Sequence, residues 1–291
     1  MIKFYCSLVF VTFFALLFSS CEVYNPEETI PSYIHIDKIN LTTSTTPVDQ
    51  GSNSSKITDA WVYIDDQSVG AFELPATFPV LYEGNHKITI KAGIKVSGIA
   101  RARAIYPFYE SYTQNFNLVK DSIINISPTV NYFSSTAFNW LEGFEDGGIK
   151  IEKTLRSDTI IEKTSDAGNV FEGTYSGVIT LDNNRGFYEG QSIKDFIIPL
   201  GNTVFLEMNY KTNNIFTVGV IAQYANNSSM NDILVINRSG EWNKIYINLT
   251  DRIRYLYDTN NPPTYKIFFQ ATKETDVSQA KIFIDNLKLL Y

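Results

Sequence analysis

The sequence predicts an all-β protein made of two β-sandwich domains. It contains 20 Phe, 18 Tyr and 3 Trp but only 3 Met. Aromatic and β-branched residues suit pleated, half-buried strands, and clusters of Asn, Gly and Asp are typical of the turns between strands. Apolar and polar residues alternate in many short runs, and no helical period persists in the first half of the chain.

An export signal precedes the predicted domains. Lys3 supplies a positive start, residues 8–18 are almost wholly apolar, and two serines lead into Cys21. A run of this length at the N-terminus is typical of a signal peptide rather than a membrane span. The ending resembles the lipobox of bacterial lipoproteins, although Phe18 stands where Leu is usual. The resemblance implies a signal peptide over 1–20, lipidation of Cys21 and a lipid-anchored, surface-facing place on the outer membrane. The alternative is a plain secretory signal cut nearby.

Charge and cysteine content exclude several classes of function. The formal net charge is −7, and no cluster of Lys and Arg stands out, which argues against a nucleic-acid partner. The two cysteines are Cys6, inside the signal peptide, and Cys21. No thiol then remains for a disulfide, a zinc site or a cysteine nucleophile.

Residues 21–32 are predicted to be a tether. The stretch EVYNPEETIPS has two prolines, three glutamates and little apolar content. Such a composition is typical of a solvated linker, here one that holds the first domain away from the membrane.

Residues 33–131 are predicted to form the first β domain. The runs AWVYIDDQSVGAFELP, LYEGNHKITIKA and YESYTQNFNL carry alternating apolar residues separated by turn signals. Their order resembles that of PEGA-like and related immunoglobulin-like modules. The resemblance implies a small β-sandwich and says little about function.

Residues 138–291 are predicted to form the second β domain, after a boundary near residues 132–139. Many strands with Asn-, Gly- and Pro-rich turns favour a sandwich. Five pieces, FEDG, GTYSGVITL, FLEMNYK, EWNKIYINL and IFIDNLKL, resemble in order and spacing the jelly-roll carbohydrate-binding modules and galactose-binding-like sandwiches. The resemblance implies the fold more strongly than it implies a sugar ligand.

The sequence argues against catalysis. The two histidines, His35 and His86, have no serine or cysteine beside them in a recognised nucleophile setting. A glycosidase needs two placed carboxylates, and no spacing singles out a pair. A glycan-active enzyme is therefore the weakest of the alternatives.

A structural calcium ion is the sharpest predicted site. Calcium binds six to eight oxygens from carboxylates and carbonyls. The resemblance implies that Glu145 and Asp285 are carboxylate ligands, with carbonyls from the turn at Gly173. The alternative is that Asp285 only caps a turn with Asn286.

Alternation also predicts a ligand-binding face on the second domain. Polar side chains that point away from the core, together with a ring, are the mix that sugar binding needs. The predicted ligand residues are Glu207, Asn209, Lys211, Gln223, Lys266, Phe268 and Gln270. The alternative is an ordinary solvated sheet face.

Two tripeptides resemble the O-glycosylation sequon of Bacteroidota. They are Asp121-Ser122-Ile123 and Asp158-Thr159-Ile160, so Ser122 and Thr159 are the predicted acceptors.

The sequence as a whole predicts a non-catalytic envelope lipoprotein that binds a glycan or surface polymer through its second domain. The main alternative is a structural subunit of an outer-membrane assembly that uses the sandwiches as protein interfaces. One apolar patch formed by Trp61, Tyr63, Phe187 and Tyr188 would favour that alternative.

Overall fold

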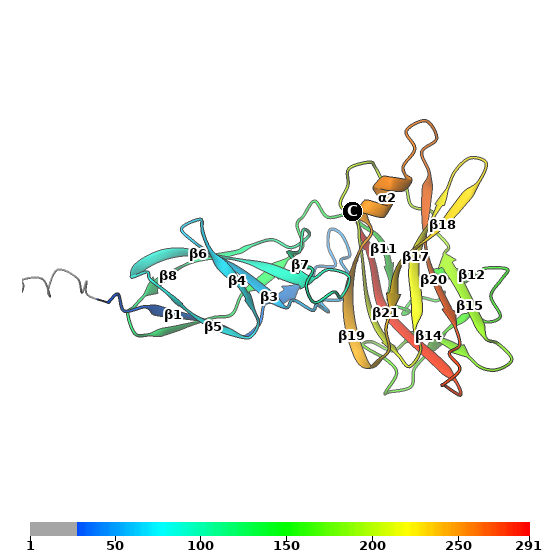
Figure 1. The fold of residues 1–291 in the computed structure, drawn as a ribbon, viewed down its shortest axis with the longest axis horizontal. Helices are drawn as coiled ribbons and strands as arrows, with labels where there is room; N and C mark the ends of the chain where they lie inside the picture. Colours follow the sequence, from blue (N-terminus) through cyan, green and yellow to red (C-terminus); the bar gives the residue numbers. More distant parts are fainter. Residues whose placement is uncertain (1–27) are drawn as a thin grey trace, which may run out of the picture.

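The computed structural model describes residues 28–291, and almost all of their regular structure is β-strand (Figure 1). The strands form two parts in succession along the chain, an N-terminal part with strands β1 to β10 and a C-terminal part with β11 to β21. The all-β prediction is confirmed. The predicted signal peptide, Cys21 and most of the predicted tether lie outside the described residues.

The N-terminal part contains three sheets. The largest has the strand order β4-β3-β6-β7 with β8 also paired to β6, and the smaller ones are β5-β1-β9 and β10-β2. The bounds are β1 Ser32–Ile36, β2 Asn40–Thr42, β3 Asp59–Ile64, β4 Gln67–Glu73, β5 Ala76–Val80, β6 Gly84–Lys95, β7 Arg103–Ile105, β8 Tyr112–Leu118, β9 Ile123–Ile126 and β10 Thr129–Asn131. The resemblance of this part to PEGA-like modules stays a prediction.

Strand β3 forms as the sequence pattern predicts. Val62 is fully buried, whereas its neighbours Trp61 and Tyr63 are half-buried. Successive side chains on a strand point to opposite faces, so one face of β3 lies in the N-terminal core. The strand ends at Asp65 and Asp66, whose φ angles of 48° and 67° make the tight turn into β4.

The C-terminal part is a sandwich of two sheets. One sheet has the order β13-β14-β21-β16-β19, with β11 also paired to β21, and the other has the order β12-β15-β20-β17-β18. The bounds are β11 Phe138–Glu142, β12 Ile151–Lys153, β13 Ile161–Thr164, β14 Ser176–Leu181, β15 Phe187–Ser192, β16 Phe205–Thr212, β17 Phe216–Gln223, β18 Ser228–Ile236, β19 Ser239–Asn248, β20 Thr264–Thr272 and β21 Ala280–Leu290.

One apolar core fills the space between these two sheets. Leu206 and Met208 on β16 and Ile267 and Phe269 on β20 belong to it, and none is more than 1% exposed. The inward residues recur at every second position, as the period of a strand requires. The residues between them form the outer faces of the two sheets, which confirms that the predicted ligand residues of both strands point away from the core.

One short helix, α2 (Thr250–Leu256), was not predicted from the sequence. Its seven residues bury only Ile253 and Leu256, which is too short a stretch for a helical period to stand out. It follows β19 directly and lies at one end of the sandwich (Figure 1). Within residues 28–291, no helix is long and apolar enough to cross a membrane.

The two parts share a continuous apolar contact. The N-terminal core includes Phe205, Tyr246 and Leu290, which come from the outer face of the six-stranded sheet. The Tyr106 ring packs edge-on against Phe205 with centroids 5.3 Å apart. The backbone joins as well, since the N–H of Ser97 donates to the carbonyl of Tyr246 at 2.8 Å.

A buried carboxylate lies at the centre of this contact. Glu207 is fully buried, and its Oε1 accepts hydrogen bonds from the hydroxyls of Tyr106 at 2.7 Å and Tyr132 at 2.9 Å. The Nζ of Lys244 lies 2.8 Å from Oε2 of Glu207. The two side chains therefore form an ion pair, although their geometry is not that of a hydrogen bond. Lys288, also buried, stands opposite Glu207 on β21 and donates to the Tyr132 hydroxyl at 3.3 Å.

The charges of this cluster depend on one another. Burial by itself would raise the pKa of Glu207, but the ammoniums of Lys244 and Lys288 outweigh it, so the pKa of this carboxyl lies below its usual value. Burial lowers the pKa of Lys288 to about 8, against the opposing attraction of Glu207. Burial also raises the pKa of Tyr106 well above its usual value, so this phenol stays protonated and donates.

We expect Glu207→Ala to lower the free energy of unfolding by about 3–5 kcal/mol, because it leaves two buried ammoniums without their carboxylate. Chemical denaturation measures the change. The matched control is Glu162→Ala on the edge strand β13, where the side chain is exposed and the expected change is within about 0.5 kcal/mol. Equal effects of the two substitutions would contradict a central role for the Glu207 cluster.

Candidate functional site

The predicted ligand residues do not share one sheet. Glu207, Asn209 and Lys211 lie on β16 in the six-stranded sheet. Gln223 on β17 and the three residues of β20, Lys266, Phe268 and Gln270, lie in the five-stranded sheet on the other side of the core. The prediction of a single polar patch is therefore wrong, because alternation gives the phase of each strand but not its sheet.

All three β16 residues point away from the core, and two of them, Glu207 and Asn209, face the N-terminal part. Glu207 is fully buried in the contact described above, so it is not available to a ligand. Asn209 is 2% exposed, and its Nδ2 donates to the hydroxyl of Ser54 at 2.9 Å. Lys211 is half-buried and donates to the carbonyl of Gly168 at 2.8 Å. The prediction that Glu207 and Asn209 contact a ligand is therefore wrong. Both side chains contact the N-terminal part of the chain instead.

Two of the β20 residues are buried as well. Lys266 is 7% exposed, and its Nζ donates to the carbonyls of Ser192 at 2.8 Å and Ile193 at 2.9 Å. Phe268 is fully buried and its ring lies against Gly219 of the neighbouring strand, where a Cβ atom would come within 2.3 Å of the ring. The prediction that Phe268 is an exposed aromatic ring is therefore wrong, because Gly219 has no side chain and leaves room for this ring on the sheet.

Gln223 and Gln270 remain half-exposed on the outer face of the five-stranded sheet. Residues that pair across strands share a face, and the registers pair Gln270 with Glu189 on β15 and with Thr217 on β17. The next row contains Gln191, paired with Phe268. This face therefore carries amides, a carboxylate and a hydroxyl on adjacent strands, about 4.8 Å apart.

A buried carboxylate organises this outer face. Glu189 is 2% exposed and accepts a hydrogen bond from the Thr154 hydroxyl at 2.8 Å. The Nε2 of Gln270 donates to it at 3.4 Å, and Nη1 of Arg156 lies 3.3 Å away. The Arg156 guanidinium also lies over the half-exposed ring of Phe187, 5.5 Å from its centroid. These contacts hold a polar row beside an aromatic ring.

Sequence reasoning missed Glu189 and Gln191 as candidates and considered Phe187 only for a protein interface. The stretch FYEGQS alternates, so their common face was readable from the sequence. Their place beside Gln270 was not, because it depends on the pairing of β15 with β20, about 80 residues away along the chain.

The two predicted calcium ligands converge on one short segment. Oε1 of Glu145 accepts the backbone N–H groups of Thr174 at 2.8 Å and Tyr175 at 2.9 Å. Oδ2 of Asp285 accepts the hydroxyl of Ser176 at 2.6 Å. The segment Gly173–Ser176 thus links both carboxylates, and it is the turn that the sequence predicted to supply carbonyls.

The residues present fit a cation in part. Burial raises the pKa of Asp285 to about 7, as expected for a carboxylate enclosed without a cationic neighbour. In residues 28–291, no three His, Cys, Asp or Glu side chains gather in a group that could hold a metal ion. Calcium would therefore take most of its six to eight oxygens from carbonyls, and the site stays a prediction.

The other predicted features have mixed outcomes. Thr159 is 8% exposed, which disfavours it as a glycosylation acceptor in the folded chain, whereas Ser122 is half-exposed. His35 bonds to the hydroxyl of Thr77 at 2.7 Å and His86 to the carboxylate of Asp65 at 2.6 Å, both on the N-terminal part.

The four aromatic residues proposed as a protein interface do not form one patch. Tyr188 is 1% exposed and belongs to the core of the C-terminal sandwich. Phe187 lies on the outer face of the five-stranded sheet, while Trp61 and Tyr63 lie on β3 of the N-terminal part. The patch that would have favoured the assembly alternative is therefore absent from these residues.

Comparison with protein-family models and with curated proteins gave no match. Several solved structures are similar. A carbohydrate-binding module from a study of the β-sandwich superfamily is 15% identical, with 91% of this chain and 100% of that one covered and a TM-score of 0.37. The family 11 carbohydrate-binding module of Clostridium thermocellum, solved in complex with a mixed-linked β-1,3-1,4 tetrasaccharide, is 13% identical over 51% and 93% of the chains, with a TM-score of 0.34. Similarity at this level assigns neither a family nor a ligand to this chain.

We expect Gly219→Ala to lower the free energy of unfolding by about 1–3 kcal/mol, because its Cβ would meet the Phe268 ring and the Asn231 carbonyl oxygen at 2.3 and 2.4 Å. Gly240→Ala is the matched control, since nothing lies within 4 Å of its Cβ position. Denaturant unfolding of the two variants compares them. A neutral Gly219→Ala would mean that Phe268 does not lie flat on β17.

We expect calcium at about 100 times its dissociation constant to raise the melting temperature by roughly 5–10 °C, because a bound ion stabilises only the folded chain. Thermal melting with calcium and with chelator measures the shift, and Asp285→Asn should abolish it. Identical melting temperatures in calcium and in chelator would contradict the predicted calcium site.

Proposed function

We propose that this chain is a non-catalytic glycan-binding protein of the cell envelope, and that the outer face of its five-stranded sheet holds the glycan. The observation that carries the proposal is the pair of half-exposed residues Gln270 and Thr217 beside the half-exposed ring of Phe187, with the buried Glu189 holding Gln270 in place. Amides, carboxylates and hydroxyls bind sugar hydroxyls, and a ring packs against the apolar face of a sugar.

The choice of sheet follows from what covers the other one. In residues 28–291, the C-terminal members of the N-terminal core are Phe205, Tyr246 and Leu290, and Phe138 packs against it; all four come from the six-stranded sheet. One end of that outer face is thus occupied by the chain itself. The strands of the five-stranded sheet lie on the side of the sandwich away from the N-terminal part (Figure 1).

The side chains of this face are held ready for a ligand. The buried Glu189, itself bonded to Thr154, accepts a hydrogen bond from Gln270 and fixes that amide, and Gln191 donates to Glu152 at 3.0 Å. Fixed polar groups lose little conformational freedom when a ligand binds, so more of the interaction energy appears as affinity.

The proposed envelope role rests on the export signal and on the direction of the chain. Strand β1 begins at the end of the N-terminal part that lies farthest from the C-terminal sandwich (Figure 1). A lipid on Cys21 would therefore hold the N-terminal part next to the membrane as a spacer and present the sandwich outward. Non-catalytic binding suits this arrangement, since both histidines lie on the spacer rather than on the proposed face.

We expect Gln191→Ala with Gln270→Ala to weaken glycan binding roughly 10- to 30-fold, because each lost hydrogen bond contributes about 1 kcal/mol. The glycan is first identified with the full chain on a glycan array, and its affinity is then measured by titration calorimetry. The matched control removes two exposed glutamines from the N-terminal part, Gln67→Ala with Gln114→Ala, and should bind as the unchanged chain does.

A folded Gln191/Gln270 variant with undiminished affinity would show that the glycan binds at another surface of the protein. No glycan retained on the array, together with capture of an envelope protein through the same sandwich, would favour the structural-subunit alternative.

A further inference from the structure

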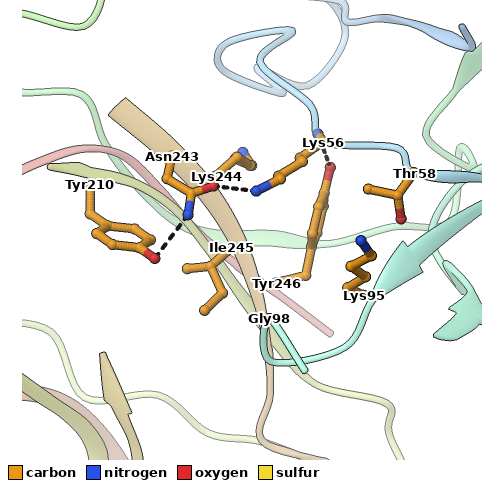
Figure 2. Close-up of a pocket in the computed structure, with 9 residues that line it drawn as sticks. All are labelled: Lys56, Thr58, Lys95, Gly98, Tyr210, Asn243, Lys244, Ile245 and Tyr246. Atoms are coloured by element: carbon orange, nitrogen blue, oxygen red, sulfur yellow. Dashed lines mark hydrogen bonds between the residues drawn. The ribbon is translucent and has the colours of Figure 1, made fainter. Parts of the chain in front are cut away.

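A small pocket opens where the two parts meet (Figure 2). Its volume is about 100 Å³, and three of its lining residues are the lysines Lys56, Lys95 and Lys244. Lys56 and Lys95 come from the N-terminal part, whereas Lys244 and the neighbouring Asn243 come from β19. No acidic side chain of the described residues lines the pocket.

The carboxylates near the pocket are already shared between cations. Glu73 lies 3.1 Å from Nζ of Lys95 and also 2.9 Å from a guanidinium nitrogen of Arg103. Glu207 pairs with Lys244 and is attracted by Lys288 as well. Arg103 also pairs with Asp59, so two carboxylates balance Lys95 and Arg103. Glu207 alone faces both Lys244 and Lys288, which leaves positive charge in excess at the junction.

Lys56 has no carboxylate of its own among the described residues. Its Nζ donates to Oδ1 of Asn243 at 2.5 Å, and Figure 2 shows this contact at the pocket. An ammonium has three N–H donors, so two remain for a ligand or water. Burial and, after it, repulsion from Lys95 lower the pKa of Lys56, which is the effect that a bound anion would relieve.

The pocket is rigid on its inner side. The Tyr246 hydroxyl accepts the backbone N–H of Lys56 at 2.9 Å, and the Tyr210 hydroxyl accepts an N–H of Asn243 at 3.0 Å (Figure 2). Tyr246 is 1% exposed and belongs to the shared core. The contact between the two parts thus fixes the position of the lysines.

We propose that this junction pocket binds a small tetrahedral oxyanion, a phosphate or sulfate group, through Lys56 and Lys95. The volume suits such a group of five heavy atoms, since one water needs roughly 10–15 Å³ of cavity. Charge-assisted hydrogen bonds from ammonium to oxyanion are among the stronger ones in proteins. Both parts of the chain line the pocket, so the anion stabilises their contact.

The oxyanion is either free or carried on a larger molecule. A second hollow of about 260 Å³ shares Lys56, Asn243 and Lys244 with the pocket and extends to the rings of Trp242 and Phe171. A sugar that carries the oxyanion would have an aromatic surface beside it. The shared chemistry is the same in both cases, and the test separates them.

The test titrates the full chain with inorganic phosphate, with inorganic sulfate, and with dextran sulfate against unsulfated dextran, all at constant ionic strength. We expect saturable binding that Lys56→Gln weakens about tenfold. Lys38→Gln, an exposed lysine elsewhere on the N-terminal part, should change nothing. Saturation by the inorganic ions assigns the pocket to free oxyanions, and binding of dextran sulfate alone assigns it to a substituent on a polymer.

A second variant distinguishes loss of the binding site from misfolding of the Lys56→Gln protein. Asn243→Asp keeps an oxygen acceptor for Lys56 but adds a negative charge to the pocket, so it should weaken oxyanion binding at least as much as Lys56→Gln. Absence of binding to phosphate, sulfate and dextran sulfate, equal binding of sulfated and unsulfated dextran, or full affinity in both folded variants would overturn the proposal. Neither result bears on the five-stranded sheet, whose glycan test uses different residues.

Discussion

The arrangement of the whole molecule depends on one buried carboxylate. Glu207 accepts two tyrosine hydroxyls from the N-terminal part and faces Lys244 and Lys288 on its own sheet. Removing a buried charge from its partners costs far more than removing an exposed one. The two parts therefore cannot separate without exposing an apolar contact and leaving this carboxylate and its ammoniums to be solvated again. Within residues 28–291, the N-terminal part extends away from the sandwich from this contact (Figure 1).

That contact divides the surface of the sandwich into two regions, each with one of the proposed binding sites. It covers one end of the six-stranded sheet, and the edge of the covered region becomes the cationic pocket beside Lys56. The five-stranded sheet stays free of it and carries the polar row around Glu189. Binding at the junction would thus depend on the contact between the two parts, whereas the proposed binding on the free sheet would use residues outside that contact.

The two carboxylates that organise these regions show the limit of alternation as a guide to function. Glu207 and Glu189 both stand at outward positions of their strands, and both are almost fully buried. The first is buried by a distant segment and the second by its own hydrogen-bonding neighbours. Alternation with a period of two distinguishes residues that face the core from residues that do not. It does not show what packs against the outer face of the sheet.

The sequence by itself determined the class of the fold and the phase of the strands, because alternation is a local property of a few residues. It predicted that β3 is a half-buried alternating strand, and it predicted which residues of β16 and β20, Gln270 among them, point away from the core. Only the tertiary structure decided which sheet each strand joins, that Phe268 lies flat on Gly219, and that Glu207 joins the two parts of the chain. These features depend on contacts between residues about 50 to 100 positions apart in the sequence. The energy of such contacts cannot be read from a short stretch of sequence, because it depends on which distant segments meet.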